Sequence, residues 1–212
     1  MKKKLLFLSM AFLLTLGISL NVTTNAEASS TSIEDEKEVY KEELSNLNQE
    51  EINESFKRID QEYAIGEEFS LKDQVFIEMY AKPVIPGGMT IFKQKYVSGS
   101  GSANGVTVKV SGYIKDDVQN IINQSFGAQD LKTSTTAGSS KVKSVKTVVH
   151  HTAYGLVGSG GVGKVYSGSI STSGKNTTLN STKRYSAIVA YASTWCTVTV
   201  NHTGGTFTIN PD

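Results

Sequence analysis

The chain has 212 residues, of which 38% are hydrophobic, with a formal net charge of +1 and a single cysteine, Cys196. This length is sufficient for one domain with its own core. One cysteine excludes an internal disulfide, so packing alone must hold the fold. The small net charge conceals two halves of opposite sign. Residues 29–80 contain 15 acidic and 5 basic residues, a net −10, whereas residues 81–212 contain 4 acidic and 13 basic residues, a net +9.

The first 28 residues have the three parts of an export signal. Lys2, Lys3 and Lys4 form a positive start, an apolar run extends from Leu5 to Leu20, and Ala26-Glu27-Ala28 offers the small residues that a signal peptidase requires. The apolar run has about 16 residues, fewer than the roughly 20 of a membrane-spanning helix. The sequence therefore predicts cleavage before Ser29 and a secreted, extracellular protein.

Residues 29–82 are predicted to form a short, acidic, helical region. Apolar residues recur there at intervals of three to five, close to the helical period. Helix starts are indicated where Asn48 precedes Glu51 and where Ser70 precedes Asp73 by three residues. Gly66 is expected to end the middle helix, and a third helix is expected over 71–81. The apolar series is Leu44, Leu47, Ile52, Phe56, Ile59 and Tyr63.

A proline- and glycine-containing linker, residues 83–90, precedes a cationic, β-rich domain over 91–212. Alternating residues predict strands at 106–110, 141–157 and 186–200, and the turn around 201–205 predicts a hairpin ending near Ile209. One helix is expected near 115–126. The predicted fold class is α+β, with an antiparallel sandwich or sheet and one helix following the acidic helical region.

The glycine-rich segment from Gly158 to Lys164 resembles both a phosphate-binding loop and a dinucleotide-binding loop, but the chemistry of each is incomplete. Val165 stands where a phosphate-binding loop needs Ser or Thr to hold magnesium, and the residues after it have the pattern of a strand. Lys183 and Arg184 stand where a carboxylate should bind ribose. We predict a turn between strands and no cofactor.

The histidines and the cysteine form no recognisable catalytic or metal-binding pattern. His150 and His151 are adjacent on a predicted strand and therefore point to opposite faces. Cys196 alternates in step with Ala192 and Val198, which predicts a buried, inert thiol. The carboxylates of Asp116 and Asp117 are expected to point away from each other, which argues against paired acid catalysis. We predict no catalytic residue and no metal site, and hence no enzyme.

The basic half has the character of a protein attracted to anionic surfaces. Its partner is predicted to be an anionic bacterial envelope or membrane surface, and nucleic acid is not expected. The acidic region could shield the basic half as an intramolecular or proteolytically released propeptide, or it could be a permanent appendage; oligomerisation is left open. The envelope-binding candidates are Lys141, Lys143, Lys146, Lys164, Lys183, Arg184, Tyr185 and Trp195.

Three classes of function fit these features. First is a secreted, non-enzymatic antimicrobial protein of bacteriocin or toxin type that acts on bacterial envelopes or membranes. Second is an envelope- or glycan-binding adhesion module, which a set of aromatic residues on one face would favour. Third is an exported hydrolase, for which the basic half offers few acids. The layout resembles that of large secreted bacteriocins of Gram-positive bacteria in its export signal, acidic leader-like half and cationic body.

Overall fold

The computed structural model describes residues 32–84, 93–118 and 123–212, and residues 32–212 belong to one compact unit. The predicted signal peptide, the site before Ser29 and most of the predicted linker lie outside the described residues. Three helices come first. They are α1 (Ile33–Leu44), α2 (Gln49–Glu62) and α3 (Leu71–Tyr80).

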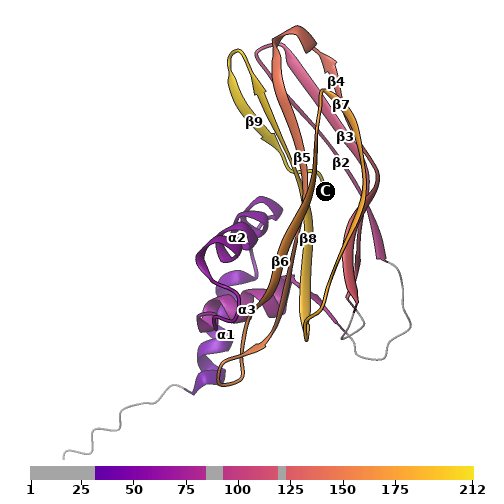
Figure 1. The fold of residues 1–212 in the computed structure, drawn as a ribbon. Helices are drawn as coiled ribbons and strands as arrows, with labels where there is room; N and C mark the ends of the chain where they lie inside the picture. The colour runs from indigo at the N-terminus through magenta and orange to yellow at the C-terminus, as the bar shows by residue number, and fades with distance from the viewer. Residues whose placement is uncertain (1–31, 85–92, 119–122) are drawn as a thin grey trace, which may run out of the picture. The chain divides into compact units, whose positions relative to one another are not determined.

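Two antiparallel sheets follow the helices (Figure 1). Sheet A has the order β1-β8-β5-β6, and β9 also pairs with β8; sheet B has the order β2-β3-β4-β7. The strands are β1 (Lys82–Pro83), β2 (Lys93–Ala103), β3 (Val106–Asp117), β4 (Gln124–Ala137), β5 (Val142–Val157), β6 (Gly161–Ser173), β7 (Asn176–Tyr185), β8 (Tyr191–His202) and β9 (Gly205–Ile209). A short 3-10 helix, η1 (Ser139–Lys141), joins β4 in one sheet to β5 in the other.

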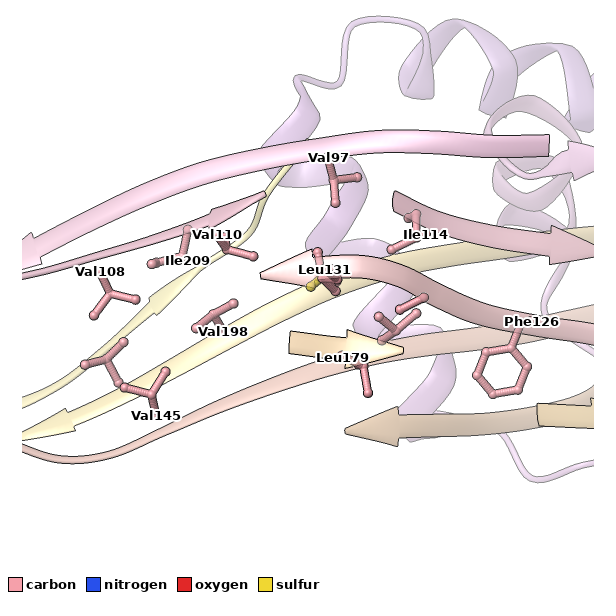
Figure 2. Close-up of a cluster of buried hydrophobic side chains, with 14 of the residues drawn as sticks. Val97, Val108, Val110, Ile114, Phe126, Leu131, Val145, Leu179, Val198 and Ile209 are labelled. Carbon is pink, nitrogen blue, oxygen red and sulfur yellow. The ribbon is translucent and has the colours of Figure 1, made fainter. Parts of the chain in front are cut away.

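The inner faces of the two sheets form the main core, part of which is shown in Figure 2. On β3, Val106, Val108 and Val110 are buried and alternate with half-buried or exposed residues. Such alternation is typical of a strand with one face in a core and the other in water. Polar side chains inside the core find partners: the buried hydroxyls of Thr133 and Thr147 lie 2.7 Å apart and bridge the two sheets.

Glycines in β2 allow β9 to approach closely. The segment 98–102 alternates serine and glycine, and its glycines face the core. A Cβ atom at Gly101 would lie 2.8 Å from both Phe207 and Ile209, and one at Gly99 would lie 3.0 Å from Ile209. A larger side chain at either position would collide with residues of β9, which explains the glycines in this strand.

The helices pack against sheet A and form a second core with it. Phe56, Ile59 and Phe76 are buried in a cluster that also contains Tyr154 of β5 and Val162 of β6. The backbone joins this interface as well, because the Phe69 amide donates to the Val162 carbonyl at 3.0 Å. The described helices and sheet A therefore pack against each other through one shared hydrophobic cluster.

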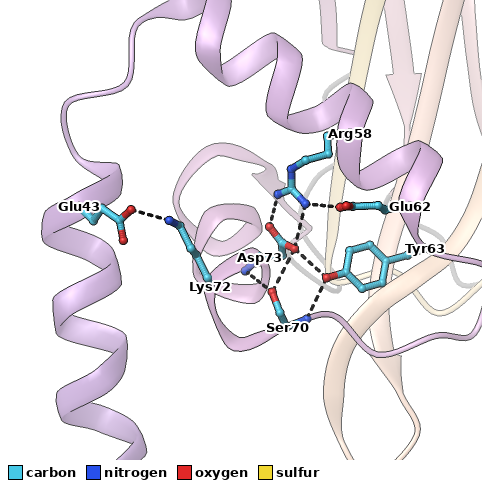
Figure 3. Close-up of polar contacts among 7 residues, drawn as sticks. All are labelled: Glu43, Arg58, Glu62, Tyr63, Ser70, Lys72 and Asp73. Carbon is cyan, nitrogen blue, oxygen red and sulfur yellow. Dashed lines mark hydrogen bonds and ion pairs between the residues drawn. The ribbon is translucent and has the colours of Figure 1, made fainter.

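Asp73 of α3 connects this helix to α2 and to the residues between the two helices through hydrogen bonds (Figure 3). Its carboxylate accepts hydrogen bonds from Arg58 of α2, from the Tyr63 hydroxyl at 2.7 Å and from the Ser70 hydroxyl at 3.0 Å. Burial opposes the charge of Asp73, but these hydrogen bonds and the charge of Arg58 hold the pKa of its carboxyl below the ordinary value. A buried carboxylate is stable here because each of these groups favours its ionised form.

The predicted helix starts at Asn48 and Ser70 are confirmed. Asn48 and Glu51 form a reciprocal capping box at α2, and the Ser70 hydroxyl accepts from the Asp73 amide at α3. The start of α1 at Ser32 was not predicted, although Ser32 and Asp35 form the same kind of box. The β-rich α+β character of the chain is also confirmed.

The predicted helix near 115–126 is wrong for every part of it that the structure describes. Lys115–Asp117 end β3, and Gln124–Phe126 begin β4; residues 119–122 lie outside the described residues. The apolar residues that suggested a helical face instead include Phe126, which points into the core from a strand. The strand predicted from residue 186 begins only at Tyr191.

Candidate functional site

Sheet B lies on the side of the sandwich away from the helices (Figure 1), and its outer face is polar. Strand register places its side chains in rows across the sheet. Successive rows are Ser100-Lys109-Ser134-Asn176, Ser98-Ser111-Lys132-Thr178, Tyr96-Tyr113-Gln129 and Gln94-Lys115-Gly127-Thr182. Hydroxyl, amide and lysine groups dominate these rows.

Four cations lie on this face: Lys109, Lys115, Lys132 and Arg184. Lys109 pairs with Ser134 and Lys132 pairs with Ser111, so the two lysines are diagonal neighbours on adjacent strands. Such neighbours are separated by about 7–8 Å. No ion pair is recorded for any of the four cations among the described residues. This face can therefore offer positive charge to an anionic partner.

A tyrosine pair lies among the cations. Tyr96 of β2 and Tyr113 of β3 are directly opposite, and their ring centroids are 5.3 Å apart in an edge-to-face arrangement. Tyr96 is 55% exposed and Tyr113 is 39% exposed. Exposed tyrosines offer a flat apolar ring with a polar hydroxyl, a combination suited to hydroxyl-rich ligands. We call the rows together with Arg184 the sheet B face.

The eight residues predicted to bind the envelope are not brought together. Lys141 and Lys143 lie near the start of β5, Lys146 lies on β5 of sheet A, and Lys183 lies on the edge strand β7. Trp195 is half-buried on β8, where its ring stacks against His150 at 5.2 Å and Phe56 at 6.3 Å. Of the eight, only Arg184 belongs to the sheet B face.

Two of the eight cannot reach a polymer in this structure. Lys164 is 5% exposed, and its Nζ donates to the backbone carbonyl of Asp60 at 2.6 Å. Tyr185 is 8% exposed, and its hydroxyl contacts His151 inside the sandwich. Both side chains have structural partners, so neither belongs to the sheet B face.

Sequence reasoning missed Lys115 and Lys132, and it treated Lys109 only as part of a strand. The alternation over 106–110 does indicate that Lys109 points away from the core. The association of the three lysines, however, depends on which strands pair and in what register. Local sequence does not determine the pairing of strands that are far apart in the chain.

The histidines separate as predicted, since His150 faces the helices while His151 lies in the sandwich core. His151 is fully buried, and its ring stacks on Phe126 at a centroid distance of 4.8 Å. Its Nδ1 lies 2.7 Å from the Thr194 hydroxyl and its Nε2 lies 2.7 Å from the Tyr185 hydroxyl. Among the described residues, no group of three or more His, Cys, Asp or Glu side chains could hold a metal ion.

The glycine-rich segment and the cysteine have the predicted structural roles. Residues 158–160 form the turn between β5 and β6, and Lys164 follows within β6. Cys196 is 1% exposed, and burial raises the pKa of its thiol to about 12. A thiol that is neither exposed nor ionised is a poor nucleophile.

Comparisons with protein families, with curated proteins and with solved structures found no match for this chain. No helix among the described residues is long and apolar enough to cross a membrane.

Proposed function

We propose that this chain is a secreted, non-enzymatic protein that binds an anionic glycopolymer of the bacterial envelope through the sheet B face. The observation that carries the proposal is the alignment of four cations and two exposed tyrosines on one open sheet. Lysine and arginine would attract phosphate or carboxylate groups, while the tyrosine rings and hydroxyls would contact sugar.

The composition of this face favours a polymer over the interior of a lipid bilayer. Between the cations stand serine, threonine, asparagine and glutamine, together with one acid, Asp117, in the row of Arg184. The large apolar residues exposed on the described part of this face are the two tyrosines. Insertion among lipid tails would require a continuous apolar patch. The acidic helices pack on sheet A, so polymer binding needs no removal of the helical region.

The test compares two pairs of exposed lysines in the chain from Ser29. The double variant Lys109→Gln, Lys132→Gln removes two charges from the sheet B face. We expect it to bind purified wall teichoic acid roughly tenfold more weakly, because two surface contacts together contribute about 1–2 kcal/mol. Binding of the unchanged protein should weaken as salt rises from about 0.05 M to about 0.5 M, as screening requires.

The matched control is Lys143→Gln, Lys146→Gln, which removes the same charge from exposed positions outside the sheet B face. It should retain nearly all of the binding. Equal losses in the two double variants would show that only net charge matters and would overturn the assignment to this face. Tyr96→Ala should weaken binding to teichoic acid more than binding to sugar-free polyphosphate if the rings contact sugar.

Antimicrobial action is the second candidate. It is favoured by the accessibility of a cationic face in a chain that still contains its acidic helices, because an attack on an envelope could then begin without proteolysis. The expected result is inhibited growth or a reduced membrane potential of susceptible bacteria. Unchanged growth and potential across a broad panel at micromolar protein, together with retained polymer binding, would instead favour an adhesion module.

A further inference from the structure

One edge of β8 has a gap in its strand pairing. Along the opposite edge, β5 pairs with β8 continuously from Tyr191 to Asn201. On the gapped edge, β1 pairs with Tyr191 and Ala192, and β9 pairs with Val198–His202. The five residues between them, 193–197, have no strand partner on this edge within the described part of the chain.

The gap arises from the paths of the two flanking strands. Beyond Ile209 the chain leaves β8 and joins sheet B, where the backbone groups of Asp212 and Ser98 exchange hydrogen bonds of 3.1 and 3.3 Å. On the other side α3 continues to Tyr80, so extended chain reaches β8 only at Lys82. Five residues of antiparallel strand span about 17 Å, enough for a short peptide.

Open space lies along this edge. A cleft of about 410 Å³ is lined by Ser193 and Thr194 of β8, by Lys95 and Gln94 of β2 and by Tyr80. A second cavity of about 200 Å³ shares several of these residues and continues past Trp195 and Cys196 to Asn210. Together they form a groove with β8 as its floor and with α2 and the edge of β2 as its walls. We call it the β8 groove.

We propose that the β8 groove binds a short, extended peptide segment carrying a carboxylate, which adds as a strand to the free edge at 193–197. Alternate residues of β8 direct their backbone N–H and C=O groups toward this edge. An added strand would complete the sheet between β1 and β9, which is a recurrent way for proteins to bind extended peptides. The site shares Gln94 with the sheet B face but none of the cations or tyrosines of that face.

The charges of the groove select the carboxylate. Lys82 is already paired with Asp116, which also accepts from the Thr194 hydroxyl at 3.4 Å. Lys95 lines both cavities and has an exposed side chain, and no ion pair is recorded for it among the described residues. Asp212 lines only the smaller cavity, so in the larger cleft Lys95 supplies the positive charge that an anionic group can approach. Ile114 and Trp195 offer apolar contact beside it.

The test uses an acetylated Thr-Val-Thr-Val peptide with a free carboxylate as the probe. Binding is followed by the amide resonances of residues 193–197 and by the fluorescence of Trp195, the single tryptophan of the chain. We expect shifts confined to the groove. A fully N-methylated peptide should bind at least about tenfold more weakly, because it cannot donate backbone hydrogen bonds.

Lys95→Gln should weaken binding of the carboxylate peptide about tenfold and leave binding of the amidated peptide unchanged, since a charge-assisted hydrogen bond is lost only in the first case. Lys143→Gln, exposed and outside the groove, should bind both peptides like the unchanged protein. Equal binding of the N-methylated peptide, or resonance shifts outside the groove, would overturn strand addition. Undetectable binding of the probe at millimolar concentration would overturn the proposal.

Discussion

His151 is the centre of a hydrogen-bond chain that crosses the sandwich core. The Thr194 hydroxyl donates to the Asp116 carboxylate at 3.4 Å, so its oxygen is free to accept a hydrogen bond from the Nδ1–H group of His151 at 2.7 Å. Nε2 then accepts from the Tyr185 hydroxyl at 2.7 Å. Every polar group in this chain has a partner only while the imidazole is neutral. Burial lowers the pKa of His151 to about 4, in agreement with that assignment.

The neutral histidine predicts a specific loss of stability in mild acid. In the unfolded chain a histidine has a pKa of about 6.5, so the unfolded state takes up the proton first as pH falls. The free energy of unfolding should therefore be highest above pH 6.5 and decrease by roughly 3 kcal/mol between pH 6.5 and about pH 4. Urea unfolding of the unchanged protein and of His151→Gln measures this loss. If the stability of His151→Gln fell equally steeply with pH, the loss would be due to other titratable groups.

At the scale of elements, β2 depends on its glycines for contact with β9. Gly101→Val should destabilise the protein by about 1–3 kcal/mol, since the new side chain has to displace Phe207 or Ile209. Ser100→Val, the neighbouring change on the exposed face, should alter the free energy of unfolding by less than about 0.5 kcal/mol. Urea midpoints measure both. Equal urea midpoints for the two variants would mean that β9 does not pack closely against β2.

The elements that sequence predicted well are those that local chemistry determines. Asn48 and Ser70 cap helices through bonds within three residues, and Val106–Val110 reveals its buried face by alternation alone. The helix expected near 115–126 failed because Phe126 acquires its burial from distant strands. The sheet B face and the β8 groove escaped prediction for the same reason. Each is assembled by strand pairing between segments that are far apart in the sequence.

At the scale of the whole molecule, Asp60 links the helical layer to the sandwich. Its carboxylate accepts from Thr152 at 3.0 Å and from Ser167 at 2.8 Å, and it lies 3.6 Å from the ammonium of buried Lys164. Residues from β5 and β6 thus meet one acid of α2. Because these contacts accompany a shared apolar cluster, we expect helices and sheets to unfold in one transition.

Asp60→Ala tests this link, because it leaves the Lys164 charge buried without its acid. Because the Asp60 side chain is 26% exposed and Lys164 keeps its hydrogen bond to the Asp60 backbone carbonyl, the loss is expected to cost on the order of 1–3 kcal/mol. Lys164→Met in the same chain should restore most of it by removing the unpaired charge. Thermal unfolding is followed by far-ultraviolet circular dichroism and by the fluorescence of Trp195, whose ring on sheet A stacks against Phe56 of α2. Both signals should move together in every variant. If Asp60→Ala separated an early loss of helix from a later change at the sheets, the acidic region would be a detachable layer, and the propeptide hypothesis would gain support.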